Sequence, residues 1–306
     1  MSEEMFYHKS VLVEEVLQYL AIKPAGTYLD VTFGSGGHTR AILEKDPTCK
    51  VIAFDWDSVS LETYGPLLQK EFPNRLKLVW GSFALLYKIL KKEKIGRVDG
   101  ILADFGTSQM QIEQRPGFSF RLDTPLDMRM SPAHQKLTAE QVLKDSSELK
   151  LSEIFWQLGE ERYSRQIARA IVQERKKKWI KTTRQLAEIV QKATPRVPRA
   201  KREKIHPATR VFQALRIYVN KELDNIFAFL PAALRALKPG GRLVCISFHS
   251  LEDRIVKDFF RQRAQIGEVE VLTSKVVVPS QEEVSANPAS RSAKLRAIEL
   301  IAQKNI

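Results

Sequence analysis

The chain is poor in cysteine and has no long apolar run, which argues against a disulfide-rich protein and against a membrane-spanning one. Only two of its 306 residues are cysteines, Cys49 and Cys245, so we expect no disulfide framework and a reducing, cytoplasmic compartment. No apolar stretch approaches the roughly eighteen residues of a membrane span, so we expect no membrane association. The acidic start of the chain, residues 1–4, is unlike a signal peptide. The five histidines are scattered without zinc-ligand spacing, so we expect no metal site.

Acidic residues are scarce in one segment, and that scarcity accounts for the whole net charge of +13. Residues 162–210 hold sixteen Lys and Arg but only three acids, and the rest of the chain is balanced. A single basic region on an otherwise neutral protein favours binding to a polyanion such as a nucleic acid. An ordinary solvated helix face is the alternative interpretation.

A glycine-rich turn near the N-terminus lacks one glycine of the dinucleotide-binding pattern. A predicted strand at residues 28–32 runs into the turn 33–38 and then a helix, and a second strand at 51–54 ends in Asp55. Glycines admit a ligand close to the backbone, and an acid about twenty residues on suits a ribose diol. The third glycine of G-x-G-x-x-G is replaced by Thr39, and Asp30 precedes the turn. A carboxylate there would repel pyrophosphate and suits the positive S-adenosylmethionine better than NAD. A glycine turn without a ligand is the alternative.

The order of predicted elements indicates an α/β domain that contains a helical insertion. Buried strands are predicted at residues 28–31, 51–54, 76–80 and 98–103 with helices between them, which is typical of a parallel sheet with both faces covered. After Asp104 this alternation stops. Amphipathic helices are then predicted at 139–158, 162–178 and 182–193, and a long helix at 207–236, interrupted near Pro231. We therefore assign residues 1–111 and 206–306 to the α/β domain, and 112–205 to a basic helical insert.

The C-terminal part indicates which kind of α/β sheet this is. After a turn at 239–241, a buried strand is predicted at 242–248, and Ser250 begins a capping box that opens a helix at 251–263. Two further strands at 269–278 and 294–301 are predicted to form a hairpin at the sheet edge. Such a hairpin is typical of class I, Rossmann-like methyltransferases, whereas dehydrogenase sheets more often stay parallel.

Several polar residues are candidates for chemistry at the carboxyl ends of these strands. Asp104 ends the fourth strand, so it should lie near Asp30, Asp55 and the glycine turn, where it can accept a hydrogen bond from an amine. Holding a turn is its alternative role. His249 is a candidate general base, although bracing of its loop is favoured.

Two segments after the fourth strand are candidates for substrate binding. Phe118 and Phe120 lie in an irregular loop and could stack an extruded base, while Arg129 could hold a phosphate. Attachment of the loop to the protein body is the alternative for these side chains. The helix that starts at 207 carries a narrow polar stripe, which favours the wall of a polar cleft over an ordinary solvent face; its members are Thr209, Gln213, Arg216 and Asn220.

These motifs together resemble the ribosomal RNA small subunit methyltransferase H family, also called MraW, along nearly the whole chain. The matching blocks are residues 8–12, 32–38, 117–120, 125–130, 159–162, 206–217, 246–254 and 290–296. The resemblance implies a class I S-adenosylmethionine-dependent methyltransferase domain with an inserted helical domain. It also implies methylation of the exocyclic N4 of a cytidine in the decoding region of 16S rRNA, with free rRNA or the small ribosomal subunit as partner. The sequence leaves open whether the chain forms a homodimer.

The resemblance also carries site residues onto this sequence. The implied cofactor contacts are Gly36, Gly37, His38, Asp55, Phe83, Asp104 and Gln111. The substrate-binding candidates are Phe118, Phe120, Arg129, Arg210, Gln213, Arg216 and Asn220. The family usually has D-L-G-V-S-S-x-Q-L-D where residues 104–113 have D-F-G-T-S-Q-M-Q-I-E, which makes Gln111 the least secure contact.

A mechanism follows as a hypothesis. The insert grips phosphates, the cytosine is extruded, and Asp104 or a nearby carbonyl accepts a hydrogen bond from its amine, which aligns the nitrogen for direct methyl transfer. Three rivals remain: an NAD-dependent oxidoreductase, a nucleic-acid-binding protein on a vestigial methyltransferase scaffold, and a DNA amino-methyltransferase. The last usually carries an Asp/Asn-Pro-Pro-aromatic motif after strand four, which is absent here.

Overall fold

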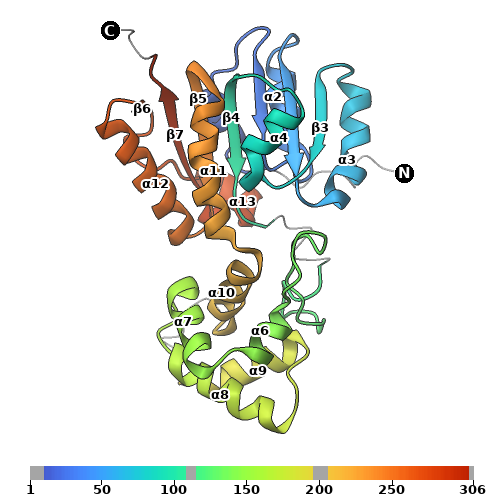
Figure 1. The fold of residues 1–306 in the computed structure, drawn as a ribbon, viewed down its shortest axis with the longest axis vertical. Helices are drawn as coiled ribbons and strands as arrows, with labels where there is room; N and C mark the ends of the chain where they lie inside the picture. The colour runs from blue at the N-terminus through green and yellow to red at the C-terminus, as the bar shows by residue number, and fades with distance from the viewer. Residues whose placement is uncertain (1–9, 108–114, 196–205, 303–306) are drawn as a thin grey trace. The chain divides into compact units, whose positions relative to one another are not determined.

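The computed structural model describes residues 10–107, 115–195 and 206–302 of the chain. The chain divides into two compact units (Figure 1). Residues Met1–Gly106 together with Leu223–Ile306 form the first, which we call the sheet unit, and Thr107–Glu222 form the second, the helical unit. The sequence-based boundaries, 111/112 and 205/206, thus differ from the structural ones, above all at the second.

Within the described residues, the sheet unit has a seven-stranded sheet of order β3-β2-β1-β4-β5-β7-β6. The pairs β1–β2, β1–β4, β2–β3 and β4–β5 are parallel, and β7 is antiparallel to both β5 and β6. A parallel sheet closed by an antiparallel hairpin is the predicted class I, Rossmann-like methyltransferase fold, which is confirmed. The strands are β1 (Thr27–Asp30), β2 (Lys50–Asp55), β3 (Leu76–Trp80), β4 (Val98–Asp104), β5 (Leu237–Ser247), β6 (Val269–Val271) and β7 (Lys294–Leu300).

Helices cover both faces of this sheet. Successive side chains of a buried strand point to opposite faces, so the strand contributes to an apolar cluster on each side. Leu29 of β1 belongs to one apolar cluster, with residues of α4, α11 and α12. Its neighbour Tyr28 belongs to the other, with residues of α1, α2 and α3. The helices are α1 (Val13–Leu20), α2 (Gly37–Lys45), α3 (Ser58–Glu71), α4 (Leu86–Lys92), α11 (Glu222–Ala236), α12 (Ser250–Gln265) and α13 (Gln281–Ala286), with 3₁₀ turns η2 (Phe83–Leu85) and η4 (Pro288–Ser292).

The helical unit packs its helices around a separate apolar core. The segment predicted as one helix at 139–158 is two helices, because Ser147 caps a second helix with its side chain. Thr138 and Thr182 begin their helices with reciprocal capping boxes. The helices are α6 (Ala139–Asp145), α7 (Glu148–Gly159), α8 (Ser164–Lys177), α9 (Thr183–Ala193) and α10 (Ala208–Asn220).

The long helix predicted from residue 207 to 236 is wrong in one respect. It breaks into α10 and α11 at Lys221, whose φ of 52° is left-handed, while Pro231 lies inside α11. Val211 and Leu215 of α10 lie in the core of the helical unit. Burial of these side chains therefore places α10 in the helical unit and moves the second boundary from 205/206 to 222/223.

Two smaller expectations at the C-terminal side also need correction. Strand β5 begins at Leu237, five residues before the predicted start, and the register of its pairing with β4 shifts between Val98 and Gly100. Strand β6 ends at Val271, well before the predicted residue 278. In the described ranges, no helix is both long and apolar enough to cross a membrane.

Candidate active site

The loop between β1 and α2 has a conformation that only glycine adopts easily. Gly34 and Gly36 have φ angles of 55° and 83°, and Gly36 directly precedes α2, whose first residue is Gly37. A Cβ at Gly36 would lie 2.9 Å from Cδ2 of Leu68 and 3.0 Å from the ring of Phe33. The tight fit explains the glycine, and it leaves the backbone of this loop bare toward the ends of the strands.

Asp55 ties this loop to the end of β2. One carboxylate oxygen accepts a hydrogen bond from the Gly34 amide at 2.8 Å, and the other from the Asp57 amide at 2.9 Å. The residue is 9% exposed, and burial raises the pKa of its carboxyl to about 7. The side chain lies where the sequence predicted it, at a strand end beside the glycine loop.

Asp30 and Thr39 form a buried pair under the loop. The Thr39 hydroxyl donates to Oδ2 of Asp30 at 2.7 Å, and the Thr32 amide donates to Oδ1 at 3.1 Å. Both Asp30 and Thr39 are fully buried, and burial raises the pKa of Asp30. The threonine in the place of the third glycine thus binds Asp30, a role that sequence reasoning missed. Both carboxylate oxygens of Asp30 accept hydrogen bonds from the protein itself.

Asp104, at the end of β4, has an oxygen left for a ligand. Its amide donates to the Thr32 hydroxyl at 2.7 Å, which joins the tips of β4 and β1. Its Oδ2 lies 3.7 Å from Nδ1 of His38, whereas Oδ1 is buried and accepts no hydrogen bond from any described residue. A buried acceptor without a donor is costly, so this atom calls for a donor that none of the described residues supplies.

The charge of Asp104 is set by its surroundings. Its side chain is 22% exposed, and burial raises the pKa of its carboxyl to about 7. His38 opposes that rise, while Asp30 and Glu252 add to it through their negative charges. Near neutral pH the carboxyl is therefore close to half ionised, and a positively charged or hydrogen-donating ligand would favour the ionised form.

His38, the second residue of α2, connects this acid to the N-terminal segment. Its ring is buried, and its Nε2 lies 2.8 Å from the carbonyl oxygen of Val11. Because a carbonyl only accepts, Nε2 carries a proton and Nδ1 is the atom that faces Asp104. His38 thus connects the start of α2 to the N-terminal segment, and its contact with the cofactor stays a prediction.

An aromatic cluster follows β3 on the same unit. Phe83 begins the turn η2, and its ring centroid lies 5.6 Å from that of Phe105 and 5.5 Å from that of Phe229. Phe105 and Phe229 are buried and Phe83 is partly exposed, so they hold its ring in place from behind. Gln111, the remaining predicted cofactor contact, lies outside the described residues.

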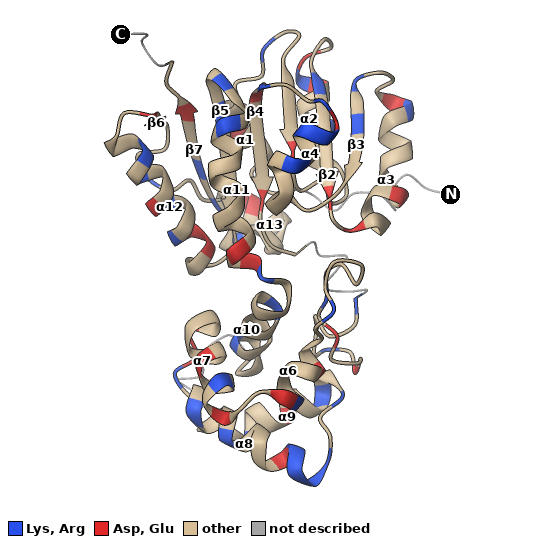
Figure 2. Ribbon diagram, viewed as in Figure 1, with Lys and Arg blue, Asp and Glu red and all other residues tan. Residues whose placement is uncertain are grey.

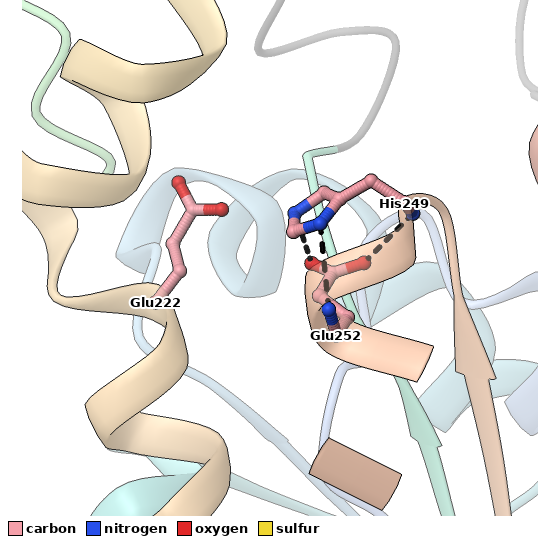
Figure 3. Close-up of side chains that lie close together, drawn as sticks. All are labelled: Glu222, His249 and Glu252. Atoms are coloured by element: carbon pink, nitrogen blue, oxygen red, sulfur yellow. Dashed lines mark hydrogen bonds and ion pairs between the residues drawn. The ribbon is translucent and has the colours of Figure 1, made fainter. Parts of the chain in front are cut away.

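The start of α12 corrects the predicted cap. His249, and not Ser250, is the N-cap: its Nδ1 accepts from the Glu252 amide at 3.4 Å, and Glu252 Oε2 accepts from the His249 amide at 3.4 Å (Figure 3). Nε2 of His249 lies 3.2 Å from Oε1 of Glu252. The predicted bracing role of His249 fits this geometry. Sequence reasoning missed the buried Glu252, although its spacing from His249 gives the capping-box signal.

In the helical unit, the loop candidates Phe120 and Arg129 contact other residues of the protein. The ring of Phe120 lies 4.6 Å from that of His206 and 5.1 Å from that of Phe212, while Phe118 is partly exposed. Arg129 donates to both oxygens of Asp127, each at 2.7 Å. Burial alone would raise the pKa of Asp127, but the bonds and charge of Arg129 lower it.

The candidates on α10 divide into buried and accessible side chains. Asn220 is fully buried and bonds the Met130 amide and the Met128 carbonyl, both at 2.8 Å. Arg216 makes a two-point ion pair with Glu222, each bond 2.9 Å long, and Glu222, also drawn in Figure 3, is buried. Arg210 and Gln213 are partly exposed. Contact of the seven candidates with substrate stays a prediction.

Comparisons with known proteins identify the family of this chain. The sequence profile of the MraW methylase family matches residues 5–301. Proteins called ribosomal RNA small subunit methyltransferase H are 50% identical in Nitrobacter hamburgensis (95% of this chain and 90% of that one) and 47% identical in Koribacter versatilis (96% and 94%). A solved rRNA methylase from Streptococcus thermophilus is a remote likeness, with 11% identity and a TM-score of 0.45 over 97% of this chain and 99% of that one. The chain belongs to the MraW methylase family.

Proposed function

We propose that this protein uses S-adenosylmethionine to methylate the exocyclic N4 amine of a cytidine in the decoding region of 16S rRNA. The family and the names of its relatives support rRNA of the small subunit as substrate. The observation that carries the proposal is the buried Oδ1 of Asp104 at the tip of β4, which has no hydrogen-bond partner among the described residues. The activity belongs in the cytoplasm, in keeping with the free, buried thiols of Cys49 and Cys245.

The residues at these strand ends fit S-adenosylmethionine. The Asp55 carboxylate lies at the end of β2, where it can hold the ribose hydroxyls, and Gly36 and Gly37 let the main chain come close to the cofactor. Phe83 offers a ring face to the adenine, and the contact of Gln111 stays a prediction. When bound, S-adenosylmethionine supplies a methyl group activated by the sulfonium. The buried acids Asp30, Asp55 and Asp104 favour its positive charge.

In the reaction, Asp104 is the residue that prepares the nucleophile. The cytosine amine is a poor nucleophile because its lone pair is delocalised into the ring. When Oδ1 of Asp104 accepts a hydrogen bond from this amine, the lone pair is returned to the nitrogen and the nitrogen is oriented for in-line attack. Positioning of this kind is worth about 7–11 kcal/mol in favourable cases. The other oxygen of Asp104, Oδ2, lies 3.7 Å from Nδ1 of His38, so it is Oδ1 that is left to face the amine.

The helical unit supplies the grip on RNA. Lys and Arg are abundant along α8 (Figure 2), and residues 162–210 carry the whole positive surplus of the chain. We assign direct RNA contacts to the accessible candidates Phe118, Phe120, Arg210 and Gln213. We assign Arg129, Arg216 and Asn220 to positioning of the loop and of α10, because their polar atoms bond the protein itself.

The test replaces Asp104 by Asn and by Ala and measures transfer of radiolabelled methyl to rRNA, with mass spectrometry of the nucleosides. Calorimetry with S-adenosylmethionine is the second readout. Loss of the acceptor in the Ala variant should lower the rate about 10²- to 10⁴-fold while the cofactor still binds, and the Asn variant, which keeps an acceptor oxygen but loses the charge, should lose less. The exposed Asp258 on α12 provides the control D258N, which should keep the wild-type rate. Methylation at the wild-type rate by the Ala variant, with cofactor bound, would overturn the role of Asp104.

A further inference from the structure

One tryptophan of the helical unit is exposed among lysines. Trp179, in the connection between α8 and α9, is 50% exposed. The Nζ of Lys144, from α6, lies 4.2 Å from its ring centroid, and that of Lys181 lies 5.9 Å away. Three more lysines directly precede it in sequence. We call this group the Trp179 cluster; it comprises Lys144, Lys176, Lys177, Lys178, Trp179 and Lys181.

The backbone beneath the cluster is fixed by hydrogen bonds. Arg175 on α8 donates to the carbonyls of Leu143 and Ser146, which attaches the end of α6, and with it Lys144, to the end of α8. On the other side, the Lys181 amide donates to the Gln185 side chain at 2.8 Å, and the Lys181 carbonyl accepts from Leu126 at 2.9 Å. The segment that carries Trp179 is therefore anchored by hydrogen bonds on both sides of the exposed indole.

Packing and helix stability do not account for this arrangement. A cation–π contact at an exposed site stabilises only slightly, and lysines in the last turn of α8 favour its dipole. Neither effect requires a large aromatic ring half in solvent, which normally is buried. Among the described residues, only Lys177 of the five lysines has a carboxylate partner, Glu174 at 2.9 Å. The cluster thus combines uncompensated positive charge with an accessible π face.

We propose that the Trp179 cluster binds single-stranded RNA, with one base stacked on the indole and the lysines on the flanking phosphates. This rests on the proposed function, because the rRNA is the strand that would lie there. Stacking on aromatic rings beside basic side chains is how proteins hold unpaired nucleotides. An acidic peptide lacks the planar base, and a duplex keeps its bases stacked within the helix. The chemistry of the cluster therefore selects an unpaired strand.

Binding of a fluorescently labelled, single-stranded ten-nucleotide RNA to the full chain tests the proposal. Replacing Trp179 by Ala should weaken binding about 5- to 100-fold, and Trp179→Phe should restore most of it. Trp156 on α7 provides a matched control, because it is 60% exposed on the same unit and makes no cation–π contact within the described residues. The Trp156→Ala variant should bind as the wild type does. Unchanged binding by Trp179→Ala, or equal losses in both variants, overturns the proposal.

Salt dependence separates the stacking from the charges. Lys144→Gln and Lys181→Gln should each lower the slope of log affinity against log salt by about 0.7, whereas Trp179→Ala should leave that slope unchanged. A polyglutamate that displaced the RNA equally well from wild type and Trp179→Ala would show a merely charged surface and contradict the stacking.

Methyl transfer distinguishes this proposal from the proposed function. If both hold, Trp179→Ala raises KM for rRNA while Trp156→Ala does not. If the wild type transfers no methyl to rRNA but binds the single strand through Trp179, the proposed function fails alone. If rRNA is methylated with an unaltered KM in Trp179→Ala, the stacking site fails alone.

Discussion

The two units use polar side chains in opposite ways. In the sheet unit, acids at the strand ends are buried, and burial raises the pKa values of Asp30, Asp55 and Asp104. In the helical unit, polar residues of the family motifs are paired internally: Arg129 with Asp127, and Arg216 with Glu222. Other charges of the helical unit are exposed, such as the lysines around Trp179.

The difference teaches where to look for function in each unit. A small ligand in a buried site is recognised by a polar atom that its neighbours leave without a partner, as Oδ1 of Asp104 is among the described residues. A polyanion is recognised by charges that solvent can still reach, so a fully bonded side chain such as Asn220 contributes to the surface only by holding it in shape. Four changes test this contrast.

The largest expected effect is at Asn220. Asn220→Ala removes the partners of the Met130 amide and of the Met128 carbonyl and should lower the free energy of unfolding by about 3–4 kcal/mol. Urea denaturation measures it. Gln213→Ala, on the same helix but partly exposed, is the control and should change stability by less than about 0.5 kcal/mol. A small loss at Asn220 with a large loss of RNA affinity would reverse the role given to it.

The next effect concerns the glycine loop of the sheet unit. Gly36→Ala should cost about 2–3 kcal/mol of stability and weaken S-adenosylmethionine binding, because the added Cβ meets Leu68 and Phe33 in a left-handed conformation. Gly240→Ala shares the positive φ, 73°, but its Cβ would meet nothing within 4 Å. It should cost only about 1 kcal/mol and leave cofactor binding intact in calorimetry. Equal losses in both variants would show that backbone strain alone matters.

The third effect is a pH dependence at Asp104. Its pKa is raised to about 7 in the folded protein, so between pH 4 and 7 the folded state keeps a proton that the unfolded state has lost. Stability of the cofactor-free protein therefore falls as pH rises through this window. Asp104→Asn should raise stability by about 1–2 kcal/mol at pH 8 and hardly at pH 4, as urea denaturation at both pH values would show.

Asp55 provides the check on this pH effect, because burial raises its pKa to about 7 as well. Part of the pH dependence should therefore persist in Asp104→Asn, and adding Asp55→Asn should reduce it further. A remainder should stay, because burial also raises the pKa of Asp30. Methyl transfer by the wild type should rise as pH increases through about 7, since the ionised Asp104 accepts the amine hydrogen bond. An Asn variant as pH-dependent in stability as the wild type would contradict the assignment.

The smallest effect is at Arg129. Lysine keeps the charge but cannot reproduce the two-point contact with Asp127, so Arg129→Lys should cost about 1 kcal/mol in urea denaturation. RNA affinity should change by less than twofold in the binding assay described above. A tenfold loss of RNA affinity at unchanged stability would make Arg129 a direct contact and break the contrast between the units.

Much of the sheet unit was predictable from sequence, and less of the helical unit. Strands β1 to β4 are short apolar runs between turns, and the glycine loop and Asp55 follow from spacing. The break at Lys221 was not predictable, because lysine seldom adopts a left-handed conformation and packing of α10 and α11 into different cores imposes it. The cap of α12 was misplaced by one residue, since both His249 and Ser250 carry side chains that can accept from the backbone.

The sequence by itself determined the layout: which segments are apolar enough to be strands, where glycine is needed, and where the positive charge gathers. These are local properties, fixed by the chemistry of neighbouring residues. Only the tertiary structure decided which polar atoms form hydrogen bonds within the protein and which stay available to a ligand. The Thr39 hydroxyl donates a hydrogen bond to Asp30, and Asn220 accepts one from a loop some ninety residues earlier in the chain. Oδ1 of Asp104, in contrast, has no donor among the described residues. Such pairings depend on distances between residues remote in sequence, which no local pattern contains.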